Sequence, residues 1–413
     1  MASIQFYPAE SNPAKVRILI IAPSLGILGG QAIQANRLLE QLRQESILEV
    51  SLLPVNPRLP GLAGNLQSIK YIRTLITSVV YGFSLLSRVR KYDVIHIFSA
   101  SYFSFVLAPT PALLVARLYG KKSLLNYRSG EAEDHLISWR RTAIPIIRLA
   151  DKIVVPSAYL VHVFAKFGLS CQSIPNFIDL DVFRFRDRVP LKPRFLSNRN
   201  LEPLYNVSCV LRAFSEIQKR IPEASLTVVG DGSERGLLEQ LAKDLKLQRV
   251  VFAGRVEPSR MPEVYDAHEV YLNSPNVDNM PGSILEAFAT GLPVVTTDAG
   301  GIPYIVQDGV SALTVAKDDH EAMASRALQL LEQKDLAARL ISAGRRESLK
   351  YCWARVRDEW IRLYSSLANQ EIPKVEVTRD TLQEAIGVGI HERYPSPAFR
   401  PSDSRPDEPT FEA

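Results

Sequence analysis

The chain has 413 residues, which is too long for one ordinary domain and predicts two or three. Hydrophobic residues make up 46% and charged residues 23%, which is the balance of a soluble globular protein. The three cysteines, Cys171, Cys209 and Cys352, lie far apart, which argues against a disulfide framework or a zinc site and fits a reducing cytoplasm. We expect no signal peptide, because no basic patch and apolar core open the chain, and no transmembrane helix, because no uninterrupted apolar stretch reaches about 18 residues.

The net charge of +5 is unevenly distributed along the chain. Residues 66–150 hold twelve Lys and Arg against four acids, a difference of +8 within one block. Solvated helix faces would explain this block, and so would attraction to anionic lipid or to an anionic acceptor. Nucleic acid is disfavoured as a partner, because no recognisable binding motif surrounds the basic residues.

The first half of the chain alternates expected strands with expected helices. Strands are predicted over residues 16–23, 93–100, 122–127 and 151–157, and residues 171–179 close this half. Helices are predicted over residues 31–44, 108–120 and 161–169, the last of them stopping at Gly168. The strand, glycine loop and helix at the start predict a Rossmann-like unit. Residues 74–92, apolar with a basic end, predict either a core helix or a membrane-facing helix.

A basic, proline-containing stretch, 182–194, separates the two halves, and we place the linker at 184–194. The alternation then restarts. Strands are predicted over residues 225–232, 249–256, 269–275, 293–301 and 311–319, and helices over residues 204–222, 233–247, 259–268 and 282–291. Two successive βα series predict an α/β protein with two doubly wound domains that face an interdomain cleft.

The end of the chain holds one more expected helix and a polar tail. Residues 351–367 place four apolar side chains, Trp353, Val356, Trp360 and Leu363, on one helical stripe. Residues 371–413 are proline-rich, with nine acids against five bases, and predict a disordered tail.

Residues 280–303, "MPGSILEAFATGLPVVTTDAGGIP", combine a charged side chain with unusually many glycines and prolines. If residues 282–291 form a helix, the helix start offers unpaired N–H groups and a positive dipole end, which bind phosphate. Glu286, about one turn in, would accept hydrogen bonds from paired ribose hydroxyls, and Asp278 adds a second carboxylate upstream. This arrangement suits a nucleotide sugar. The alternative is that Glu286 only complements the helix dipole.

The segment 278–315, "DNMPGSILEAFATGLPVVTTDAGGIPYIVQDGVSALTV", resembles the donor-site signature of the family 4 glycosyltransferases. The resemblance extends over roughly residues 15–368 and includes the glycine loop, the "DVIHIFSA" strand, residues 150–183, "LTVVGDGSERGLLEQLA" and "VVFAGRV". It implies a retaining, metal-independent enzyme of the GT-B fold. It also implies domain boundaries: a tail at 1–14, an acceptor domain at 15–183 completed by a crossover helix at 351–368, a donor domain at 195–350 and a tail at 370–413.

The resemblance assigns a role to each matching residue. Glu286 would hold the ribose hydroxyls, and Asp278 would hold those of the transferred sugar, with a shorter reach than the glutamate more common in the family. Arg199 matches the basic residue that neutralises the diphosphate. Candidate catalytic residues are Arg128, Arg199 and Asp278. The further donor-binding candidates are Gly29 and Gly30 in the loop, Arg255 and Val256 near the base, and Met280, Pro281, Gly282 and Ser283, whose backbone N–H groups would cradle the diphosphate.

Two positions depart from the family pattern. Where the family usually has lysine and then glycine, this chain has Leu204 and Tyr205, so the diphosphate loses one expected cation. Where many relatives have a histidine that contacts the transferred sugar, it has Arg128. Arginine is permanently charged, so Arg128 would clamp phosphate, bind a carboxylate on the sugar or acceptor, or pair with Glu131. Loss of activity is the remaining alternative.

The sequence therefore predicts a retaining glycosyltransferase that uses a nucleoside-diphosphate sugar and needs no metal or other cofactor. The acceptor would be a glycan, a lipid-linked molecule or a small molecule, and the protein would be cytoplasmic, with a peripheral contact to the inner face of the membrane as one option. Two alternatives remain: a catalytically impaired nucleotide-sugar-binding partner in polysaccharide assembly, and a GT-B epimerase or phosphorylase, although no cofactor lysine for a phosphorylase is evident.

Overall fold

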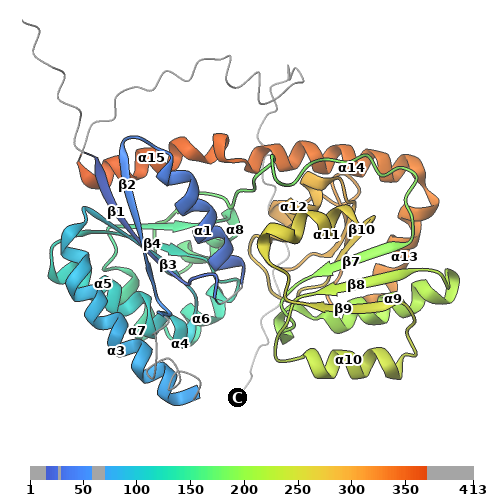
Figure 1. The fold of residues 1–413 in the computed structure, drawn as a ribbon, viewed down its shortest axis with the longest axis horizontal. Coiled ribbons are helices and arrows are strands. Elements are labelled where there is room, and N and C mark those ends of the chain that lie inside the picture. The colour runs from blue at the N-terminus through green and yellow to red at the C-terminus, as the bar shows by residue number, and fades with distance from the viewer. Residues whose placement is uncertain (1–14, 27–28, 58–69, 370–413) are drawn as a thin grey trace, which may run out of the picture. The chain divides into compact units, whose positions relative to one another are not determined.

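The computed structural model describes residues 15–26, 29–57 and 70–369, with side chains from residue 73 onward in the last range. The predicted tails at 1–14 and 370–413 lie outside the described residues. Two parallel six-stranded sheets dominate the described chain, with the orders β2-β1-β3-β4-β5-β6 and β12-β11-β10-β7-β8-β9 (Figure 1). The predicted pair of doubly wound Rossmann-like domains is therefore confirmed.

The first sheet and its helices come from the first half of the chain. Its strands are β1 (Val16–Ala22), β2 (Leu48–Pro54), β3 (Val94–Ser99), β4 (Lys122–Tyr127), β5 (Lys152–Val155) and β6 (Gln172–Ser173). Its helices are α1 (Gly30–Arg43), α3 (Lys70–Arg88), α4 (Tyr102–Leu107), α5 (Pro109–Leu118), α6 (Ala132–Ser138), α7 (Arg140–Ile147) and α8 (Ala158–Ala165).

The second sheet repeats the alternation. Its strands are β7 (Arg194–Asn198), β8 (Ser225–Val229), β9 (Val250–Gly254), β10 (Val270–Asn273), β11 (Val294–Thr297) and β12 (Leu313–Val315). Its helices are α9 (Val207–Arg220), α10 (Arg235–Asp244), α11 (Met261–Asp266), α12 (Gly282–Thr290), α13 (His320–Glu332) and α14 (Lys334–Ser348), and α15 (Trp353–Ala368) follows. Short 3-10 helices are η1 (Val89–Lys91), η2 (Pro203–Tyr205), η3 (Pro258–Arg260), η4 (Ile302–Tyr304) and η5 (Leu349–Tyr351).

Each sheet is covered on both faces, which explains why the central strands β1 and β3 are nearly continuous buried runs. In β1, Leu19 and Ile21 join a core with α3, α5, α6 and α8, while Ile18 and Ile20 join a core with α1 and α15. The second sheet packs α9 and α13 on one face and α11 and α12 on the other. In each parallel sheet the loops that follow the strands lie at the carboxyl edge, which is where α/β proteins bind ligands.

Helix α15 returns the end of the chain to the first sheet (Figure 1). The stripe predicted from sequence is buried there: Val356, Trp360 and Leu363 are each at most 6% exposed. The Trp360 ring stacks on His96 of β3 at 5.2 Å, and Arg357 forms a 2.6 Å ion pair with Glu45. The last helix is therefore part of the core of the first half.

Several elements differ from the sequence-based expectation. Helix α8 ends at Ala165 rather than Gly168, whose φ of +66° belongs to the turn that follows. The short strands β2 and β7 and the helices α4, α6, α7, α13 and α14 were not predicted, and β7 begins within the predicted linker, at Arg194. Helix α3 has one face in the core, where Tyr81 and Leu85 are buried, and another face on which Phe83 is exposed, so its contact with a membrane stays a prediction. No helix of the described residues is both long and apolar enough to span a bilayer.

Candidate active site

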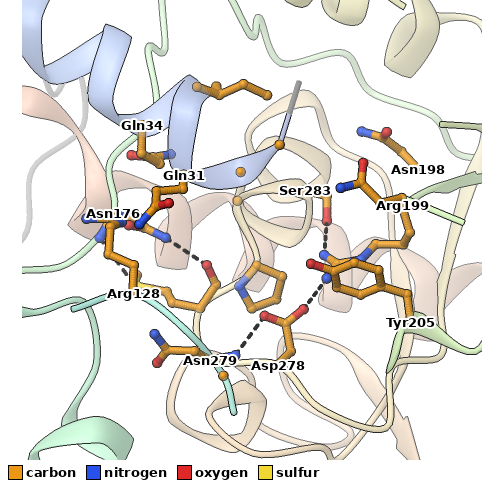
Figure 2. A pocket seen from close by; sticks show the side chains of 18 of the residues that line it. Gln31, Gln34, Arg128, Asn176, Asn198, Arg199, Tyr205, Asp278, Asn279 and Ser283 are labelled. Carbon is orange, nitrogen blue, oxygen red and sulfur yellow. Dashed lines mark hydrogen bonds and ion pairs between the residues drawn. The ribbon is translucent and has the colours of Figure 1, made fainter. Parts of the chain in front are cut away.

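A cavity of about 400 Å³ opens between the carboxyl edges of the two sheets. It is lined by residues that follow β3, β4, β7, β8 and β9 and by the first turns of α1 and α12 (Figure 2). All of the predicted site residues line this one cavity: Gly29, Gly30, Arg128, Arg199, Arg255, Val256, Asp278, Met280, Pro281, Gly282, Ser283 and Glu286. Residues from both halves of the chain, far apart in sequence, are thus brought together, although what each binds stays a prediction.

The loop from Asp278 to Pro281 presents the start of α12 to the cavity. The Asn176 side-chain amide donates to the Met280 carbonyl at 2.8 Å, and the Gly301 N–H donates to the Asp278 carbonyl at 3.0 Å. A Cβ on Gly301 would stand 1.9 Å from the Asn279 carbonyl oxygen, so only glycine allows the two loops to approach this closely. The two glycines Gly300 and Gly301 therefore pack directly against the backbone of this loop.

One predicted donor at the helix start is chemically wrong. Pro281 is the N-cap of α12 and has no N–H to give to a phosphate. Its carbonyl instead accepts from the Ile284 N–H at 3.2 Å. The backbone donors available at this helix start are those of Gly282 and Ser283, which begin the nine-residue helix.

Arg199 and Asp278, predicted to bind different parts of one donor, bind each other in this structure. The Arg199 guanidinium donates to the Asp278 carboxylate and, at 3.2 Å, to the Ser283 hydroxyl (Figure 2). The Tyr205 ring stacks on the same guanidinium at 4.1 Å. Burial alone would lower the pKa of Arg199, but the Asp278 carboxylate outweighs it and raises that pKa further. Tyr205 thus fills the space below the predicted phosphate-binding cation.

The Glu286 carboxylate also has two partners from different elements. Arg37 of α1 donates to one carboxylate oxygen at 2.6 Å, and the Tyr265 hydroxyl donates to the other at 2.9 Å. Burial and then the Glu286 charge raise the pKa of Tyr265 well above its ordinary value, so this hydroxyl stays protonated and donates. The Arg37 guanidinium stacks on Phe183 at 5.3 Å. A ligand hydroxyl bound by Glu286 would therefore have to share the carboxylate with Arg37 or displace it.

Arg128 reaches the cavity from the loop after β4. It donates to the Asn126 side-chain oxygen at 3.3 Å and stacks on Phe98 at 5.4 Å. Burial lowers the pKa of Arg128 to about 9, so the side chain is still charged at neutral pH. The pairing with Glu131 that the sequence allowed is absent, since no ion pair joins these two residues. Burial, with a contribution from Asp134, instead raises the pKa of Glu131.

The remaining candidates lie at the edges of the cavity. Arg255 is largely exposed and lies 3.8 Å from Asp231, while Val256 beside it packs on the core around α11 and α12. Gly29 precedes α1 and faces the Asn200 amide of the other half, which a Cβ would approach to 3.9 Å. No three His, Cys, Asp or Glu side chains of the described residues are grouped as metal ligands would be.

Comparison with known proteins finds a family match for the second half of the chain. The sequence profile described as "Glycosyl transferases group 1" matches residues 183–347, the half of the chain that carries α12. The solved structure of Anabaena Alr3699/HepE with UDP-glucose superposes with a TM-score of 0.68 at 17% identity, over 85% of this chain and 99% of that one. Residues 183–347 are therefore similar to group 1 glycosyltransferases. The GT-B fold of the chain is shared with these structures.

Curated relatives are more similar in sequence than this solved structure. The N-acetyl-alpha-D-glucosaminyl L-malate synthase of Bacillus anthracis is 29% identical over 46% of this chain and 52% of its own length. The GDP-mannose-dependent alpha-(1-6)-phosphatidylinositol monomannoside mannosyltransferase of Mycobacterium tuberculosis is 25% identical over 74% of this chain and 84% of its own length. The chain therefore spans about half the length of the first of these relatives and most of the second.

Several residues in or behind the cavity were not found from the sequence. Gln34 and Arg37 lie one turn apart on the face of α1 that meets α12, so their helical spacing was the available signal. Asn176, which lines the cavity, and Tyr265, which is buried behind it against Glu286, had no signal, because only the tertiary fold brings their segments to this place. The glycine turn after β8 packs closely on the end of β7: a Cβ on Gly230 would stand 2.0 Å from the Arg199 carbonyl oxygen.

Proposed function

We propose that the protein transfers a sugar from a nucleoside-diphosphate sugar to an acceptor hydroxyl, with retention of configuration and without a metal. One observation carries this proposal. A single cavity is lined, in spatial order along its wall, by Glu286, the start of α12, Arg199 and Asp278. This order matches a ligand with hydroxyls at both ends and anionic phosphates between them.

In the proposed complex each group has a chemical reason for its position. Glu286 accepts hydrogen bonds from the ribose hydroxyls. The diphosphate accepts hydrogen bonds from the N–H groups of Gly282 and Ser283. It also replaces the Asp278 carboxylate as the ion-pair partner of Arg199. Asp278, released from Arg199, accepts hydrogen bonds from the sugar hydroxyls. Because Arg199 now pairs with Asp278, binding consists of an exchange of charged partners with little new burial of unpaired charge.

The proposed reaction needs no enzyme nucleophile. The bond between the anomeric carbon and the diphosphate oxygen breaks, and its electron pair stays on the diphosphate. Arg199 and the start of α12 stabilise that growing charge. The acceptor oxygen bonds to the same face of the anomeric carbon, and its proton passes to the departing diphosphate. No lysine is among the described residues that line the cavity, and Tyr205 stacks on Arg199. Arg199 therefore neutralises more of the diphosphate charge than the family pattern predicts.

The relatives support a nucleotide-sugar donor and leave its base open. HepE was solved with UDP-glucose, whereas the mycobacterial mannosyltransferase is named for GDP-mannose. Their acceptors also differ, since one relative is named for L-malate and another for a phosphatidylinositol mannoside. We therefore propose the donor class and leave the acceptor as a hydroxyl compound.

A test of the function measures nucleotide release and product anomer together. Purified protein is given UDP- and GDP-sugars with acceptor mixtures, and NMR determines the configuration of the new bond. We expect retained configuration, and at least ~100-fold lower turnover in Asp278→Asn and Arg199→Gln. Binding without turnover for any acceptor would favour the non-catalytic binding partner, and conversion of the donor without acceptor would favour an epimerase.

We also propose a peripheral membrane contact through an apolar and basic face of the first half. Exposed apolar side chains gather on three helices: Leu75, Val79, Phe83 and Leu86 on α3, Phe103, Val106 and Leu107 on α4, and Leu114 and Leu118 on α5. Hydrogen bonds from Tyr81 to the Ala108 carbonyl and from Tyr119 to the Leu86 carbonyl hold α3 beside α5. Exposed bases on these segments, Arg73, Arg90, Lys91 and Arg117, complement an anionic lipid surface.

Co-sedimentation with vesicles tests this contact. We expect binding to phosphatidylglycerol vesicles that weakens at high salt and that Phe83→Gln and Phe103→Gln reduce at least tenfold. Leu237→Gln is the matched control, because Leu237 is as exposed as these residues, at 71%, but lies on α10 of the other half. Equal losses in all three variants, or no binding by the wild type, would contradict the proposal.

A further inference from the structure

The charges in the cavity do not balance pair by pair. Its charged lining consists of four arginines and four acids: Arg37, Arg128, Arg199, Arg255, Glu131, Asp231, Asp278 and Glu286. Three of the arginines have an acid beside them, namely Arg37 with Glu286, Arg199 with Asp278 and Arg255 with Asp231. Arg128 forms no ion pair with any acid in the described part of the chain. An arginine that faces a cavity without a counter-charge is arranged for an anion that comes from outside the chain.

Arg128 is also held in a fixed position. It donates to the Asn126 side-chain oxygen at 3.3 Å, and the Asn126 amide donates in turn to His96 Nε2 at 3.0 Å. Burial lowers the pKa of His96 to about 3, so the ring is neutral and its Nδ1–H donates to the Tyr364 hydroxyl at 2.8 Å. This chain of hydrogen bonds runs from α15 to the cavity. It orients the Arg128 guanidinium before any ligand arrives.

The position of Arg128 is at the sugar end of the proposed donor. A Cβ on Gly130 would lie 3.1 Å from the Val277 side chain and 3.2 Å from the Asp278 backbone, so the loop after Arg128 packs on the loop that carries Asp278. Figure 2 shows Arg128 and Arg199 on opposite sides of Asp278 and of the start of α12. In the proposed complex Arg199 therefore faces the diphosphate from one side, and Arg128 lies on the other side.

We propose that Arg128 selects a donor whose transferred sugar carries a carboxylate, so that the donor is a nucleoside-diphosphate hexuronate. This inference rests on the function proposed above. A guanidinium offers a planar fork that matches a carboxylate, and the sugar end of a neutral hexose has no group that neutralises it. Asn176 Oδ1, buried in the same cavity without a hydrogen-bond partner among the described residues, offers an acceptor for a neighbouring sugar hydroxyl. Arg128 is thus a specificity-determining residue.

The other acid near Arg128 does not take its place. Glu131 lies three residues along the loop, but it forms no ion pair with Arg128, and the charge that acts on it is that of Asp134. The diphosphate is a poorer guest for Arg128, because Arg199 and the start of α12 already face it from the opposite side. A phosphate clamp is still a distinct outcome of the experiment.

Calorimetry with matched donor pairs tests the proposal. Wild-type protein is titrated with UDP-glucuronate against UDP-glucose, with GDP-mannuronate against GDP-mannose, and with UDP and GDP alone. We expect one hexuronate to bind at least ~10-fold tighter than its hexose, as a charge-assisted pair of hydrogen bonds implies. Arg128→Gln should reduce this ratio to ~1 and leave the affinity for the bare nucleotide unchanged, while Arg128→Lys should retain part of the ratio.

Arg255→Gln is the matched control, because this arginine lines the same cavity at its other end and should change the affinities without changing the ratio. If the wild type binds hexuronate and hexose donors with an affinity ratio near 1 in both pairs, the proposal is overturned. This measurement uses the wild type alone, so it does not depend on the folding of any variant. The proposal would equally be overturned if Arg128→Gln weakened the bare nucleotide as much as the hexuronate, which is the result for a phosphate clamp. Failure of UDP and GDP to bind the wild type at all would reject the proposed function itself.

Discussion

At the scale of single residues, the cavity is defined by charged side chains that have partners from other elements. Glu286 is bound by Arg37 and Tyr265, and Asp278 is bound by Arg199. The sequence motif predicted that the two acids and Arg199 lie together, because all three belong to recognisable local patterns. It did not predict Arg37, which approaches Glu286 from 249 positions away in the chain and belongs to no motif.

Removing Arg37 should change donor affinity and stability in opposite directions. In Arg37→Ala the Glu286 carboxylate no longer shares its oxygen with a guanidinium, so we expect UDP or GDP to bind ~3- to 10-fold tighter. The melting temperature should fall, because a buried carboxylate loses its counter-charge. Arg43→Ala, an exposed arginine on the same helix, is the control and should change neither quantity. Weaker nucleotide binding by Arg37→Ala would show instead that Arg37 contacts the donor.

The neutral histidine behind the cavity makes stability depend on pH. Burial lowers the pKa of His96 from 6.5 to about 3, and burial also lowers that of His135 to about 4. Between these values and pH 6.5 the unfolded chain binds protons that the folded protein does not, so stability rises with pH in this window and is lost on acidification. We expect a slope of up to ~1.4 kcal/mol per pH unit for each histidine.

Urea unfolding at pH 5.0 and pH 7.5 measures this slope. His96→Asn should be less stable than the wild type at pH 7.5, because contacts of the buried ring are lost. It should nevertheless lose less stability on acidification, because one of the rings whose pKa is lowered by folding is gone. An unchanged difference between the two pH values would show that His96 does not stay neutral in the folded protein.

At the scale of secondary-structure elements, local sequence was a good guide where it fixes the backbone. The Pro-Gly-Ser start of α12 and the apolar runs of β1 and β3 predicted those elements within a residue or two. Strand β7 was missed, because it has only two buried apolar side chains, Phe195 and Leu196, and its polar residues are typical of a linker. Helix α3 gave two interpretations, since its apolar residues cover both a buried and an exposed face.

The glycine pair after β11 offers a test at this scale. Gly301→Ala would place a Cβ 1.9 Å from the Asn279 carbonyl oxygen, so the loop that carries Asp278 must move. We expect at least ~10-fold weaker nucleotide binding and a loss of about 1–3 kcal/mol in the free energy of unfolding. Gly236→Ala on α10 is the control: its Cβ meets nothing within 4 Å, and alanine favours a helix. Equal effects of the two substitutions would show that the close contact does not position the loop.

At the scale of the described molecule, the cavity exists because two parallel sheets present their carboxyl edges to it. The alternation of strands and helices predicted both sheets, and the apolar stripe of α15 predicted a buried last helix. What the sequence could not predict is which side chains meet across the cavity, such as Arg37 with Glu286. Those contacts depend on tertiary geometry that no local pattern encodes.

The central claim is that Glu286 recognises the ribose of a nucleoside-diphosphate sugar. The most direct measurement compares the affinity of UDP and GDP with that of their 2′-deoxy forms, for the wild type and for Glu286→Ala. We expect the wild type to bind one ribonucleotide at least ~10-fold tighter than its deoxy form, and we expect Glu286→Ala to bind both forms equally. If the ribonucleotide preference is the same in Glu286→Ala as in the wild type, Glu286 does not bind the ribose and the assignment of this cavity is wrong.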